Sequence, residues 1–192
     1  MTLTEPQRFL NDLEQQLTVL SPKQQLTFGA ICCERHFPEY LRFSIDQHWG
    51  DPNALRLAID LVWKEVSDDK PTNLEELKAL LERCIEATPD SDDFPRAVSD
   101  YAQDAAIMVC HLINFLEERN PSSVVQIASR ARDLIDAKVQ FERKFDPADP
   151  ELEVKIANDQ AMVSEIATQK SDLRKVSNVN DLRELARLRQ PV

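Results

Sequence analysis

Three ionisable residues have spacings that place them on one face of a helix predicted near the middle of the chain. Asp100, Asp104 and His111 are separated by four and seven residues, so their side chains point to the same side of an α-helix. A carboxylate and an imidazole arranged in this way can act as a general acid and base in a cleft. Charged stripes on helices more often form solvated faces, and this favours a structural role.

A second combination of residue types occurs in a helix predicted over residues 52–66. Arg56, Asp60 and Trp63 follow one another at i, i+4 and i+7, so a cation, a carboxylate and an indole share one helix face. These side chains could line a groove for an anion or a peptide. The alternative is an interhelical salt bridge beside a packed aromatic residue, and it is favoured because buried Arg and Asp are usually paired.

The sequence contains none of the usual motifs for a metal site or for a catalytic nucleophile. None of the three histidines has an acidic residue three positions before it, and the spacing from Cys33 to His36 has no second half to complete a zinc site. Two isolated glycines cannot form a phosphate-binding loop. Composition allows a Cys–His nucleophile from Cys32 or Cys33 with His36 or His111, but nothing indicates a lowered thiol pKa. We therefore expect no catalytic residue, no metal ion and no cofactor.

The number and positions of the glycines and prolines predict an all-α fold. Two glycines are too few for the turns of an all-β protein, whereas eleven prolines stand where helices begin or connections run. Apolar periodicity, N-caps at Ser21 and Asp51, a capping box from Thr72 to Glu75, and a stop at Pro38 predict seven to eight helices. They cover approximately residues 6–20, 22–36, 40–49, 52–66, 72–88, 96–119, 121–144 and 151–175, with a final turn or two after residue 181.

The helix predicted over residues 96–119 is expected to lie at the centre of a compact bundle. Its stretch Ala105–Leu116 is the most apolar run of the chain, with His111 and Asn114 as its only clearly polar residues. A helix that is apolar nearly all round is usually surrounded by other helices. The acidic segment 89–95, which precedes it, predicts a surface loop.

Charge is divided unevenly along the chain. The net charge is −11, yet residues 170–192 carry six basic and three acidic side chains. We expect one helical domain over residues 1–192, in which residues 171–192 form a basic C-terminal tail that can fray. The acidic balance of the whole argues against nucleic-acid binding, because contact with phosphates needs clustered Lys and Arg.

The sequence shows no features of membrane-spanning, exported or disulfide-bonded proteins, and this predicts where the protein is located. No stretch approaches about 18 uninterrupted apolar residues, and the chain begins without a basic leader or an apolar signal region. The four cysteines have no disulfide-framework spacing, and this is typical of a reducing compartment. We expect a cytoplasmic protein without a membrane partner.

Four short segments of the sequence together resemble a known protein family. They are ICCERHFPEY at 31–40, WGDPNALRLAIDLVW at 49–63, PDSDDF at 89–94, and the pair Asp104–Ala105. Together they resemble the YjaG-like family of uncharacterised bacterial proteins, a domain of unknown function, over about residues 17–178. The resemblance implies a compact all-helical cytosolic protein and brings no reaction or ligand. The positions that match the family pattern are Glu34, Arg35, Asp51, Arg56, Asp60, Trp63, Asp92, Asp93 and Asp104, whereas His36 and His111 do not match it.

Two functional interpretations follow. The first is a protein-binding or scaffolding and regulatory protein without catalytic activity, whose basic tail folds against the acidic body or docks on a partner, and which self-associates as a homodimer. The second is a small enzyme or ligand-binding protein with a charged pocket between the helices predicted over 22–36, 52–66 and 96–119. The candidate polar cluster is Glu34, Arg35, Arg56, Asp60 and Asp104. No small molecule is identifiable as a ligand.

Overall fold

The computed structural model describes residues 3–68, 72–90, 92–94, 96–179 and 181–189. Residues 1–2, residues 91 and 95 of the expected loop, and residues 180 and 190–192 of the expected tail lie outside these ranges. The described residues form helices and no strand, which confirms the all-α prediction. The helices are α1 (Glu5–Thr18), α2 (Pro22–Gln47), α3 (Pro52–Ser67), α4 (Leu74–Glu86), α5 (Arg96–Glu118), α6 (Pro121–Arg143), α7 (Leu152–Asn158), α8 (Gln160–Ser177) and the 3₁₀ helix η1 (Leu182–Leu188).

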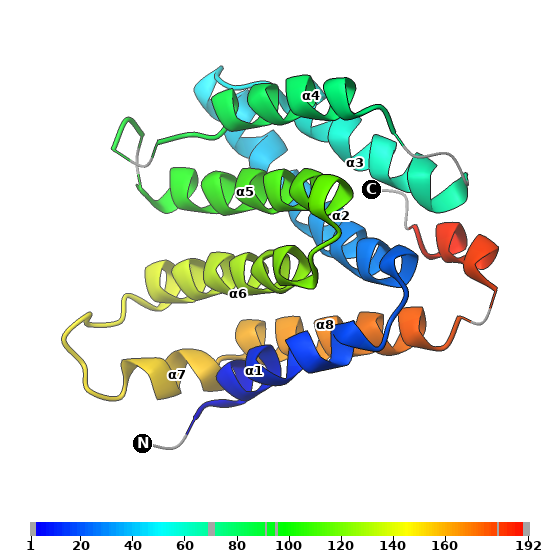
Figure 1. Cartoon of the computed structure of the whole chain (residues 1–192). Coiled ribbons are helices and arrows are strands. Elements are labelled where there is room, and N and C mark those ends of the chain that lie inside the picture. The colour runs from blue at the N-terminus through cyan, green and yellow to red at the C-terminus, as the bar shows by residue number, and fades with distance from the viewer. Residues whose placement is uncertain (1–2, 69–71, 91, 95, 180, 190–192) are drawn as a thin grey trace.

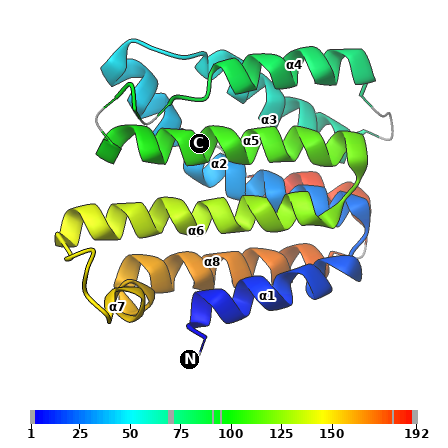
Figure 2. The same ribbon diagram turned by 60° about the vertical axis from the view of Figure 1, so that its left-hand side comes forward.

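The helices pack in two layers around one core (Figures 1 and 2). α4, α5, α6 and α8 lie side by side, with α1 beside α6 and α8. α2 crosses behind α5 and α6, and it also contacts α3, α8 and η1. Within the described ranges, no helix combines the length and apolarity needed to cross a membrane.

The apolar helix expected at the centre is α5. It packs against α2, α3, α4 and α6, and most of the stretch Ala105–Leu116 is buried. Met108, Leu112 and Phe115 have no exposed surface. α2 shares this central position, because it is buried along most of its length and touches helices of both layers.

α2 continues through Pro38, so the predicted stop and the separate helix over residues 40–49 are wrong. A proline inside a helix costs about 3 kcal/mol, because it removes one backbone donor and crowds the preceding turn. Tyr40 and Phe43 follow it and are fully buried, and burial of each contributes roughly 1.5–3 kcal/mol. Packing after the proline therefore outweighs the local penalty. The helix ends where His48 adopts a left-handed conformation with φ 52°.

The predicted capping box at the start of α4 is also wrong. Thr72 donates from its backbone N–H and its hydroxyl to Glu65 Oε2, at 3.2 and 2.9 Å. Asn73 caps α4 in its place, since its side-chain oxygen accepts from Glu75 N at 2.8 Å. The buried Glu65 carboxylate, which also pairs with Arg119, draws the threonine away from the helix.

The single helix predicted over residues 151–175 is divided at Asp159. This residue has an extended backbone, and its carboxylate caps α8 by accepting from Ala161 N at 2.9 Å. The same carboxylate accepts from Arg143 Nε at 2.8 Å. These two contacts stabilise the corner between α7 and α8, which the apolar periodicity did not reveal.

The corner after α2 depends on Gly50 and Tyr40. Gly50 has φ +88°, and a Cβ atom built there would overlap Tyr40 Oη. The Tyr40 hydroxyl donates to Ala87 O at 2.6 Å and accepts from Asp51 N at 3.1 Å. This one hydroxyl connects the end of α2 to the start of α3 and the end of α4.

We predict that Gly50→Ala lowers the free energy of unfolding by roughly 2–4 kcal/mol, because it combines a left-handed backbone with displacement of a bonded hydroxyl. Urea denaturation measures the change. In a Tyr40→Phe background the penalty should be smaller, since the overlapping oxygen is absent. An equal penalty in both backgrounds would contradict this role for the tyrosine hydroxyl.

Candidate functional site

Three of the five candidate residues meet between α2 and α3. The buried Glu34 carboxylate accepts from Arg56 Nη1 at 2.7 Å and from Arg56 Nη2 at 2.8 Å. Arg56 Nε donates to Asp60 Oδ1 at 3.1 Å, and its guanidinium lies 5.2 Å from the ring centroid of Phe37. We call Glu34, Arg56, Asp60 and Trp63 the α2–α3 cradle.

Arg189 from the end of the described chain completes the cradle. Its Nε donates to Glu34 Oε1 at 2.9 Å, and its Nη2 donates to Asp60 Oδ1. The guanidinium lies 5.8 Å from the ring centroid of Trp63. Arg189 has no local sequence signal, although the contrast between a basic tail and an acidic body was a signal for such a contact.

The cradle is balanced in charge. Two carboxylates face two guanidinium groups, and both Glu34 and Asp60 accept from both arginines. Burial alone would lower the pKa of Arg56, but the hydrogen bonds and charges of Glu34 and Asp60 raise it on balance. Arg56 is therefore ionised at neutral pH.

Arg35 points to another helix and forms a separate cluster. Its Nη2 donates to Glu165 Oε1 at 2.9 Å and its Nη1 donates to Asp172 Oδ2 at 2.8 Å, both on α8. His36 Nε2 lies 3.4 Å from Glu165 Oε1. Burial acts to raise the pKa of Glu165, but His36 and Arg35 together lower it to about 2.

Asp104 belongs to a third cluster, on α5. Arg130 Nη1 of α6 donates to Asp104 Oδ1 at 3.1 Å. Burial raises the pKa of Asp104 to about 6; Arg130 acts against the rise, and Asp133 adds to it. Burial, aided by Arg130, lowers the pKa of His111. The five candidates are therefore divided among three ion-paired clusters.

The cysteines are held as thiols. Burial raises the pKa of Cys32 and of Cys84 to about 12 and that of Cys110 to about 11. Burial also raises the pKa of Cys33 well above its ordinary value. A thiol must lose its proton to act as a nucleophile, so these four are poorly suited to that chemistry.

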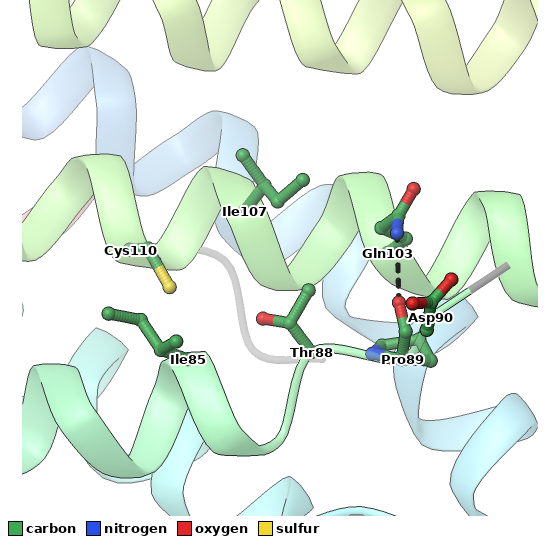
Figure 3. Close-up of a pocket in the computed structure, with 7 residues that line it drawn as sticks. All are labelled: Ile85, Thr88, Pro89, Asp90, Gln103, Ile107 and Cys110. Atoms are coloured by element: carbon green, nitrogen blue, oxygen red, sulfur yellow. Dashed lines mark hydrogen bonds between the residues drawn. The ribbon is translucent and has the colours of Figure 1, made fainter.

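A shallow pocket of about 370 Å³ lies between α4 and α5 (Figure 3). Cys110 of α5 points toward Ile85 of α4, Ile107 and Thr88 also line the pocket, and Gln103 Nε2 donates to Pro89 O at 2.9 Å. Its lining comes from residues other than the five candidates. Over the described ranges, no group of three or more His, Cys, Asp or Glu side chains could hold a metal ion.

A family model and two curated relatives match this chain. A family model described as "Protein of unknown function (DUF416)" matches residues 12–192. The chain is similar to the uncharacterised protein YjaG of Escherichia coli K12, with 31% identity over 105 residues, and to that of Salmonella typhimurium LT2, with 30%. These matches cover 54% of this chain and 52% of each relative, so the chain spans about half the length of the curated relatives it matches.

The fold likeness is broader than the sequence likeness. The crystal structure of a DUF416 family protein from Shewanella baltica OS155 matches with a TM-score of 0.81 and 23% identity. The match covers 91% of this chain and 89% of that one. At this level of identity the likeness concerns the fold alone.

We predict that Arg35→Met destabilises the protein by roughly 3–5 kcal/mol, because the buried Glu165 loses its guanidinium partner and the buried Asp172 keeps only Lys175, at 2.9 Å. Urea denaturation measures the loss. Arg42→Met is the matched control, because Arg42 is exposed and its pair with Glu39 is long, at 3.5 Å. If both variants lose the same stability, the Arg35 cluster is not a stabilising element.

The raised pKa of Asp104 predicts a pH-dependent difference between the wild type and Asp104→Asn. Between its ordinary pKa of 3.8 and the folded value of about 6, the folded protein binds a proton that the unfolded chain releases. Asp104 therefore contributes stability at low pH, and this contribution is lost as the pH rises through 6. From pH 4 to pH 7 the variant should gain on the order of 2 kcal/mol relative to the wild type.

Urea unfolding of both proteins at a series of pH values measures this difference. The other titrating groups are present in both chains, so the contributions of those far from Asp104 cancel. A stability difference that stays constant across the series would refute the raised pKa.

Proposed function

The chain belongs to the DUF416 family of proteins of unknown function, and we propose that it is a cytoplasmic, non-catalytic protein-binding protein of the scaffolding or regulatory kind. The binding surface is the α2–α3 cradle. In the free protein this surface is covered by the protein's own C-terminal segment, residues 181–189, which we call the C-terminal latch. A partner binds by replacing the latch.

The contact of Arg189 with Glu34, Asp60 and Trp63 carries this proposal. It joins a segment of the basic tail to a polar surface of the acidic body through the kind of contact that one protein makes with another. Charged side chains at such a surface orient an incoming partner and speed its arrival. The cradle is therefore suited to a segment presented by another chain.

The latch is held by apolar packing, with Ala186 and Leu188 partly buried against the core, and by one cation. Leu185 is fully buried, and Arg189 enters the cradle. Arg187 points to solvent, and its described ion pair is local, to Glu184. A 3₁₀ helix also has poorer hydrogen-bond geometry than an α-helix. Because the latch is a short segment in which Leu185 is the side chain described as fully buried, it can be displaced without unfolding the body.

The pairing of the candidate residues supports a binding role over a catalytic one. Each of the five has an opposite charge within hydrogen-bond distance. Burial raises the pKa of Asp104 to about 6, so a small enzyme that uses it as a general acid is the second candidate function. Exchange of latches between two copies would give the homodimer that we propose as the form of self-association.

We predict that a fluorescent peptide with the sequence of residues 179–192 binds a full-length variant whose latch is released by Leu185→Asp and Arg189→Ala. The wild type should bind the peptide at least about tenfold more weakly, because its tethered latch competes at an effective concentration on the order of millimolar. Fluorescence anisotropy measures binding, and circular dichroism checks that the variant is folded.

Light scattering on the same samples over a salt series reports whether two chains exchange latches. Arg189→Ala alone provides a milder second variant if Leu185→Asp disturbs the fold. A folded released variant that does not bind the peptide would contradict the proposed function.

A further inference from the structure

We propose that the α2–α3 cradle is an arginine-recognition site whose ligand is a protein segment with the pattern Leu-x-x-x-Arg. This inference rests on the proposed function and specifies the class of its partner. The latch itself carries the pattern, with Leu185 as the apolar anchor and Arg189 as the cation. The partner's arginine occupies the place that Arg189 holds in the free protein.

The geometry of the cradle fits a guanidinium. Arg189 uses two nitrogens of one planar group to reach carboxylates on two different helices, while its plane lies near the face of Trp63. A guanidinium has donors fixed in a plane, and it combines them with stacking on an aromatic ring. A lysine ammonium is a compact and strongly hydrated point charge, so it cannot make the same set of contacts together.

The charge of the cradle requires a second cation. Arg56 is resident, since it is bound by Glu34 through two nitrogens and packs on Phe37. When Arg189 leaves, two carboxylates remain beside one guanidinium; with Arg189 in place, the side chain of Glu34 is only 6% exposed. A buried carboxylate without full compensation is costly, so the open cradle attracts a cation from a partner.

Trp63 provides an independent indication of a peptide ligand. It is 3% exposed, and its indole Nε1 has no hydrogen-bond acceptor among the described residues. A buried donor without an acceptor is unfavourable by about 1–3 kcal/mol. The described part of the latch leaves this donor without an acceptor, so a partner segment that places a backbone carbonyl there gains a hydrogen bond that the latch lacks.

The test compares variants of the peptide of residues 179–192 on the released full-length protein. Arg189→Lys in the peptide should weaken binding about tenfold, and Arg189→Gln should weaken it further. Leu185→Ala in the peptide should weaken binding as well, because it shortens the apolar anchor. Arg187→Gln is the matched control. It removes one positive charge from a side chain that is 78% exposed in the latch, and it should change binding no more than about twofold.

The preference for arginine over lysine should itself depend on the cradle. In the released variant that also carries Asp60→Asn, the ratio of the affinities for the arginine and lysine peptides should fall toward one. An uncharged amide then replaces one of the two carboxylates that bind the guanidinium. Asp60 is partly exposed, so this variant is expected to fold.

The outcomes separate this inference from the proposed function. If the parent peptide binds and the lysine peptide binds equally well, arginine recognition is wrong and the binding function stands. If Arg187→Gln weakens binding as much as Arg189→Gln, general charge attraction explains the binding, and the site is not specific. If the parent peptide does not bind, the proposed function fails together with the inference.

Discussion

The pairing of two adjacent charges on α2, one buried and one partly buried, is the constraint on which the rest of the structure depends. Glu34 and Arg35 lie on a helix packed inside the bundle, and each needs an opposite charge from another element. Glu34 finds Arg56 on α3 and Arg189 beyond η1, whereas Arg35 finds Glu165 and Asp172 on α8. Because an unpaired buried charge costs several kcal/mol, these pairs fix where α3, α8 and the latch sit around α2.

Glu34 and Arg35 differ in whether their charged partners can be exchanged. Arg35 is bound by carboxylates of a long helix that packs on both α2 and α6, so its partners cannot leave without the helix. Glu34 keeps Arg56 even when Arg189 departs. The first cluster therefore acts as a fixed part of the fold, and the second acts as a site where one cation is resident and the other replaceable.

Features that depend on neighbouring residues could be predicted from the sequence, whereas ion pairs between distant residues could not. The buried stretch of α5 and the N-caps Ser21 and Asp51 follow from apolar periodicity and side-chain chemistry within a few residues. The Arg56–Asp60 pair follows from its i, i+4 spacing. The passage of α2 through Pro38 and the corner at Asp159 depended on tertiary contacts, which local signals do not contain.

The partners of the candidate residues lie far away in the chain. Arg189 is 155 positions from Glu34, and Glu165 is 130 positions from Arg35. Spacing within a helix cannot identify such pairs, so the five candidates were read as one cluster, whereas the structure divides them among three. The opposite charges of body and tail were the one global signal, and they pointed to a contact without identifying its residues.

The central claim is that Arg189 interacts directly with the cradle carboxylate Glu34. A double-mutant cycle with Glu34→Gln, Arg189→Gln and the double variant, followed by urea denaturation, measures that interaction most directly. The account predicts a favourable coupling free energy of at least about 0.5 kcal/mol that diminishes as salt is added. Additive effects of the two substitutions, at low and at high salt, would contradict it.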